Sequence, residues 1–277
     1  MNPKELTVIE HIEELRNRLV VCAVIFVLSL FVGFYFAEPV IKFIQYRSQE
    51  ADLLTLNAFN VTDPLAVYLQ VTFLISLVIT SPVILYQLWA FITPGLHETE
   101  RKATLKYIPY AFLLFVGGIA FGYFVLFPSV LQFMMNLSEK LNIEQTIGIN
   151  EYFSFLFKLV LPFGLLFQLP VVVLFLSRLG ILNPTLMSKF RKYSYFVLFV
   201  IAVLLAPPDI VSYLIISIPL FALYEISIII ARLGYKKFLV AEEQRQREEQ
   251  EESNRQQVEA LLAEQRSQIE KMSNQHP

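Results

Sequence analysis

The side chains that could do chemistry are few in this chain, and they form no recognisable catalytic set. All three histidines lie outside the long apolar runs: His11, His97 and His276. The charged residues well inside those runs are Lys158 and Glu225. A metalloprotease requires HExxH and an ATPase requires GxxxxGK[ST], and neither pattern occurs. A single cysteine, Cys22, excludes an intrachain disulfide and a cysteine metal cluster. We therefore expect no enzyme, no metal and no cofactor, so any work must be driven by a partner ATPase or by the membrane potential.

The composition indicates a membrane protein. The chain has 277 residues, of which 56% are hydrophobic, and its mean hydropathy is +0.56. These values are too apolar for a soluble domain of this size. The net charge of −2 gives no basic face for nucleic acid. The predicted fold is all-α, a polytopic membrane protein with six transmembrane helices at about 19–37, 65–88, 104–127, 152–176, 193–206 and 210–231.

Prolines and glycines predict how these spans end and pack. Glu38-Pro39 is expected to end the first span and Pro128 the third. Gly117-Gly118 and Gly122 favour close helix approach in the third span. The fifth run, 193–206, would rise only about 21 Å as a helix, against a hydrocarbon core of roughly 30 Å.

The ends of the chain are predicted to lie on one side of the membrane. Lys and Arg are concentrated on the side that carries both termini, so this side is expected to be cytoplasmic. Composition changes abruptly near residue 236, which divides the chain into a membrane domain, 1–235, and a polar cytoplasmic tail, 236–277. The tail is predicted to be helical or disordered. A solubilising role and a partner-binding coiled coil both remain open for it.

Three spaced motifs carry a resemblance to a known family. They are SPVILYQLWAFITPGLHETERK at 81–102, HIEELRNRL at 11–19, and LLAPPDIVSYLIISIPLFALYEISI at 204–228. This set resembles TatC, the signal-peptide receptor of the twin-arginine translocase. The resemblance implies a cupped, multi-pass protein of the bacterial inner or plasma membrane, with short last two spans.

The resemblance also implies a function and partners. It implies binding of twin-arginine signal peptides at the cytoplasmic face and recruitment of single-span TatA- and TatB-type subunits. Folded proteins would be exported, driven by the proton-motive force. Other copies of the chain and the lipid bilayer complete the implied partners.

The family's signal-peptide residues map onto five positions. The glutamates of its ELR and ER motifs correspond to Glu14 and Glu100, and each could bind a guanidinium bidentately. Arg16 matches the arginine of ELR and would shape the pocket by pairing with a carboxylate, while Phe91 and Pro94 match the family's loop and would fix its exit angle. The alternatives are a helical pair of Glu14 with an arginine four residues on, a solvated loop charge at Glu100, and membrane anchoring by Arg16.

Three polar residues of the later spans are candidates for contacts with partner subunits. Gln168 stands where many family members have Glu, so it keeps hydrogen bonding but loses ionisation, and an interhelical bond within the chain is the alternative. Asp209 follows Pro207-Pro208 and is better explained as a helix cap. Glu225 could snorkel or pair across helices, and an intramembrane acid is a functional candidate by default.

A second function class is a secondary transporter of small solutes. Such a transporter should show inverted repeats, broken helices and a polar site at the midplane. The sequence shows no convincing internal repeat and little polar content at that depth.

Overall fold

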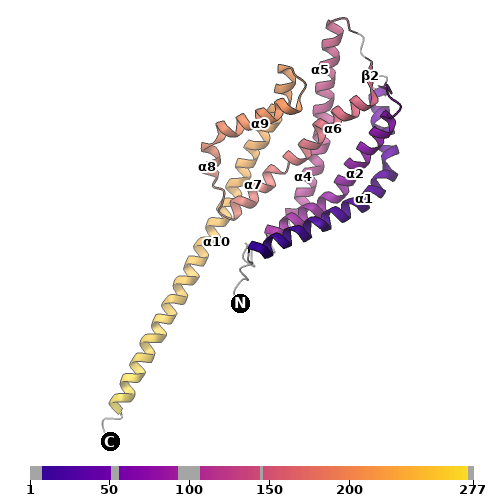
Figure 1. The fold of residues 1–277 in the computed structure, drawn as a ribbon. Coiled ribbons are helices and arrows are strands. Elements are labelled where there is room, and N and C mark those ends of the chain that lie inside the picture. Colours follow the sequence, from indigo (N-terminus) through magenta and orange to yellow (C-terminus); the bar gives the residue numbers. More distant parts are fainter. Residues whose placement is uncertain (1–7, 51–55, 93–106, 144–145, 274–277) are drawn as a thin grey trace.

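The computed structural model describes residues 8–50, 56–92, 107–143 and 146–273, which are almost entirely helical (Figure 1). The helices are α1 (Val8–Glu50), α2 (Asp63–Ile92), α4 (Tyr107–Phe121), α5 (Phe127–Lys140), α6 (Ile149–Leu166), α7 (Leu169–Arg178), α8 (Pro184–Lys189), α9 (Arg191–Leu205) and α10 (Ile210–Ser273). A π-helical turn, η2 (Gly122–Leu126), joins α4 to α5. Two short strands, β1 (Leu56–Asn57) and β2 (Ile147–Gly148), pair in parallel with Leu56 opposite Ile147.

The all-helical membrane fold is confirmed. Within the described part, five helical stretches are long and apolar enough to cross a bilayer. They correspond to the first, second, third, fourth and sixth predicted spans. The fifth corresponds to α9, whose 15 residues rise about 22 Å.

The core is built around α6, which runs diagonally across the molecule (Figure 1) and packs against both α4 and α2. One face of α6 carries fully buried side chains, among them Phe153, Leu156, Leu159 and Phe163. Their spacing of three or four residues places them on one side of the helix. In a bilayer, where burial of apolar surface gives little advantage, such packing holds helices through van der Waals contact.

Small and hydroxyl residues join α1 to α2. Ser29 Oγ lies 2.9 Å from Thr80 Oγ1, and Ser76 Oγ donates to Ser29 O at 3.0 Å. A Cβ built on Gly33 would lie 2.6 Å from the backbone oxygen of Thr72. The two helices therefore approach at backbone distance, with hydroxyl hydrogen bonds between them.

Two prolines do not end helices as we expected. Pro39 lies inside α1, because the turns on both sides of it pack on the core through Ala37 and Ile44, which are 0% and 6% exposed. Pro128 is the second residue of α5 and follows the π turn, after which Phe127 N donates to Gly122 O. The wider turn shifts the bonding register, so the helix continues past a residue without an N–H.

The fourth span is broken, a feature that we did not predict. α6 ends at Leu166 and α7 begins at Leu169, with Pro170 in the first turn of α7. Proline lacks the N–H that would donate to the carbonyl of Leu166, so the continuous series of helical backbone hydrogen bonds is interrupted there. Gln168 lies in the break.

The polar tail continues α10 as a helix to Ser273, which extends away from the helical bundle (Figure 1). The apolar part of this helix, 210–231, and its charged part therefore form one continuous helix.

Candidate functional site

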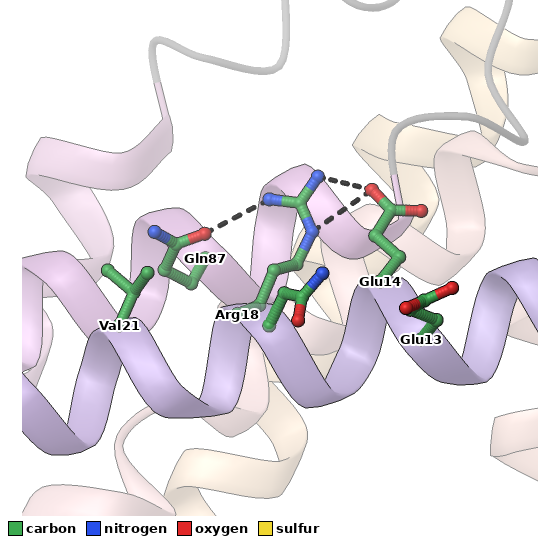
Figure 2. Close-up of a pocket in the computed structure, with 6 residues that line it drawn as sticks. Glu13, Glu14, Arg18, Val21 and Gln87 are labelled. Carbon is green, nitrogen blue, oxygen red and sulfur yellow. Dashed lines mark hydrogen bonds and ion pairs between the residues drawn. The ribbon is translucent and has the colours of Figure 1, made fainter.

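Two of the sequence motifs meet at the contact between α1 and α2. Glu14 and Arg18 lie one turn apart on α1, and Arg18 Nε donates to Glu14 Oε1 at 3.1 Å (Figure 2). Arg18 Nη1 donates to Gln87 Oε1 at 3.0 Å, across to α2. Gln87 belongs to the SPVILYQ run and Arg18 to HIEELRNRL, 69 positions earlier. One guanidinium thus ties the first motif to the second and orients the Glu14 carboxylate.

These residues line an open hollow of about 450 Å³. Glu13, Asn17 and Val21 complete its α1 side, and Figure 2 shows Glu13 and Val21 beside Glu14 and Arg18. The side chains of Glu14 and Arg18 are only about a quarter exposed. A carboxylate held in a partly desolvated hollow attracts a planar cation more strongly than one in open solvent.

The predicted pairing of Glu14 with an arginine four residues on is present, and the partner is Arg18. Arg16 does not join the hollow. Its Nη2 lies 2.9 Å from Glu13 Oε1, and these two side chains are 67% and 60% exposed. An exposed pair of this kind contributes little to stability. Phe91 lies half-buried near the end of α2, whereas Glu100 and Pro94 lie outside the described residues.

Gln168 forms the interhelical bond that we gave as its alternative role. Its Nε2 donates to Ala111 O of α4 at 3.0 Å. Its Oε1 is buried and accepts no hydrogen bond from the described residues. A buried amide oxygen without a donor is costly in an apolar region. The break in the fourth span thus holds one polar group that is only half satisfied.

Glu225 pairs across helices, not along its own. Its Oε1 lies 2.8 Å from Arg191 Nε, and Arg191 Nη2 donates to Oε2 at 3.0 Å. Tyr195 Oη donates to Oε1 at 2.5 Å. Asp209 caps α10, because its Oδ1 accepts from Ser212 N at 2.7 Å. The bonds of Glu225 therefore join α9 to α10, whereas the Asp209 bond stabilises the first turn of α10.

Sequence reasoning missed two parts of these arrangements. Gln87 was not among the predicted site residues, although it stands inside the SPVILYQ run. The partners of Glu225 were missed because Arg191 and Tyr195 lie more than 29 positions away. The signal that could have identified Gln87 was its place at the end of the SPVILYQ run, which belongs to one of the three motifs.

Comparisons with known proteins agree with the motifs. The family model described as Sec-independent protein translocase protein (TatC) matches residues 10–219. The chain is 54% identical to the Sec-independent protein translocase protein TatCy of Bacillus subtilis over 86% of this chain and 93% of that protein. It is 50% identical to TatC of Halalkalibacterium halodurans over 90% and 98% of the two chains.

Solved structures give the same result at the level of the fold. Two crystal structures of the twin-arginine translocase receptor TatC match with TM-scores of 0.73 and 0.74 at 34% identity. The match to the first structure covers 81% of this chain and 99% of the chain in that structure. These matches favour the translocase reading over the solute-transporter alternative. With a family model that covers most of its length and relatives at half identity or more, the chain belongs to the TatC family of Sec-independent protein translocase proteins.

Proposed function

We propose that this chain is the receptor subunit of a twin-arginine protein translocase. It binds the two consecutive arginines of a signal peptide through Glu14 and Glu100 and recruits single-span subunits of the TatA and TatB type. Folded precursors are then exported, driven by the proton-motive force. The observation that carries the proposal is the Glu14 carboxylate, oriented by Arg18 in the hollow where the α1 and α2 motifs meet.

Family membership establishes the general class of the protein. As a TatC protein the chain is a multi-pass membrane component of a translocase and not an enzyme. The distribution of Lys and Arg supports a cytoplasmic location for both termini and for the hollow. This orientation would place the hollow where a signal peptide arrives.

The charges around the hollow suit a cationic ligand. Its lining carries two carboxylates, Glu13 and Glu14, and one guanidinium, Arg18. An arriving guanidinium would share the Glu14 carboxylate with Arg18, and Gln87 would keep Arg18 in place. The second arginine of the peptide needs a second carboxylate, which Glu100 supplies in our proposal.

The test is peptide binding to purified variants in detergent. Glu14→Gln keeps the shape of the side chain and removes its charge, so about 1.5–3 kcal/mol of charged hydrogen bonding is lost. We expect affinity for a twin-arginine peptide to fall on the order of tenfold or more. A twin-lysine peptide should bind wild type more weakly, because an ammonium cannot make the bidentate contact.

Glu13→Gln is the matched comparison, since it removes a charge from the same lining, but from a side chain that is 60% exposed and pairs with Arg16. It should lower the affinity much less than Glu14→Gln does. Equal losses in both variants would mean a diffuse acidic surface and would refute the specific site. Glu100→Gln and Glu98→Gln form a second matched pair of the same design.

A further inference from the structure

A second hollow, of about 560 Å³, lies between α10 and the segment that contains α8. Its polar lining comes from both elements: Asn183, Thr185, Ser188, Arg232, Tyr235 and Lys236. The signal-peptide hollow shares none of these residues.

The charge in this second hollow is unbalanced. Arg232 and Lys236 stand four positions apart, on one face of α10, and both are exposed. Neither forms an ion pair with a residue that the structure describes, and the described lining contains no acidic side chain. Like charges at this spacing destabilise a helix, so a bound anion would relieve a repulsion that the fold retains.

The hollow is held in shape by close backbone contacts. Gly180 has φ of 72°, and a Cβ there would overlap the ring of Phe238 on α10. A Cβ on Gly234 would lie 3.0 Å from the backbone oxygen of Leu174. Asn183 Oδ1 accepts from Thr185 N at 2.9 Å. The segment before α8 is therefore fixed against α10, and a ligand would meet a preformed site.

Along α10, the hollow lies at the boundary between the apolar and the charged parts of the helix. Residues 210–231 are apolar except for scattered polar side chains, and Arg232 opens the charged part. Large apolar side chains nevertheless remain exposed around the basic pair. Leu233 is 61% exposed on α10 and Leu186 is 47% exposed on α8. A basic hollow with exposed leucines on a membrane protein lies where lipid headgroups meet acyl chains.

We propose that this hollow binds the phosphate of an anionic phospholipid headgroup. The Arg232 guanidinium and the Lys236 ammonium contact the phosphate oxygens, and the hydroxyl groups of Thr185 and Ser188 can donate further hydrogen bonds. Basic pockets between transmembrane helices are suited to such headgroups. The exposed leucines lie beside the lipid chains, which distinguishes a lipid from free phosphate. The inference requires only that the chain is embedded in a bilayer, so it is independent of signal-peptide binding.

The experiment counts lipids bound to the purified full-length chain by native mass spectrometry. The protein in detergent is titrated with phosphatidylglycerol, with phosphatidylcholine, and separately with inorganic phosphate. The test variant combines Arg232→Gln with Lys236→Gln. The control combines Lys192→Gln with Lys237→Gln, which removes the same charge from exposed residues outside the hollow. A third variant, Arg232→Lys with Lys236→Arg, keeps both charges.

We expect phosphatidylglycerol to bind wild type, the control and the charge-preserving variant with similar affinity. The test variant should lose about tenfold or more of that affinity. Phosphatidylcholine should be insensitive to all variants, and inorganic phosphate should bind far more weakly than phosphatidylglycerol. Equal phosphatidylglycerol affinity in the test and control variants would overturn the proposal, as would binding of phosphate as tight as that of the lipid. If the hollow instead binds an acidic protein segment, phosphatidylglycerol should bind the test and control variants with equal affinity.

Discussion

Two adjacent glycines in α4 provide a sharp test of how α4 and α6 pack. A Cβ built on Gly118 would lie 2.6 Å from the backbone oxygen of Phe163 and 2.8 Å from Cβ of Phe167, whereas one on Gly117 would meet nothing within 4 Å. Gly118→Ala therefore forces α4 away from α6. Gly117→Ala places the same methyl group, one position earlier in the same helix, into open space.

The magnitude follows from the difference between the two variants. Replacing Gly by Ala in a helix stabilises it by roughly 0.5–1 kcal/mol, and this contribution is the same for both positions. It cancels in the comparison, which leaves the cost of overpacking, about 1–3 kcal/mol. We expect Gly117→Ala to be neutral or slightly stabilising and Gly118→Ala to be destabilising.

The assay is unfolding of the purified chain in mixed micelles of mild detergent and sodium dodecyl sulfate, followed by circular dichroism. The midpoint for Gly118→Ala should fall below wild type, and that for Gly117→Ala should not. Equal midpoints for the two variants would refute the close approach of α4 to the backbone of α6.

The same assay tests the two ends of the α9–α10 hairpin. Asp209→Ala removes the cap of α10 and should cost about 1 kcal/mol, while Asp209→Asn keeps a capping oxygen and should retain most of the stability; equal losses would argue against the cap. Glu225→Gln weakens the pair with Arg191, and we expect a cost on the order of 1 kcal/mol. In a double-mutant cycle, Arg191→Gln should add little to Glu225→Gln, and simple additivity would contradict the pairing.

Much of the fold could be predicted because membrane insertion depends on local sequence. A bilayer selects long apolar runs, so the runs at 65–88 and 152–176 predicted helices that the structure contains in α2, α6 and α7. The Asp209 cap was also predictable, since a cap involves only neighbouring residues. The family resemblance was likewise contained in contiguous motifs, each read within a few tens of residues.

Other features depended on contacts that the local pattern does not contain. Pro39 looks like a helix end, but the packing of Ala37 and Ile44 keeps α1 continuous. Gly117 and Gly118 look equivalent, yet the rotation of α4 against α6 makes only Gly118 a contact residue.

The candidate site shows the same division. The motifs identified Glu14 as a carboxylate near the membrane, and a spacing of four predicted its pairing with Arg18. The bond from Arg18 to Gln87 arises because α1 and α2 approach closely along their small and hydroxyl residues. The partner of Gln168, the backbone oxygen of Ala111, likewise depends on how α4 lies beside the break in the fourth span. The sequence by itself determined which residues form helices and which carry charge, because those properties are local. The tertiary structure decided which of these residues meet, because helix rotation and crossing depend on packing along the whole length of both helices.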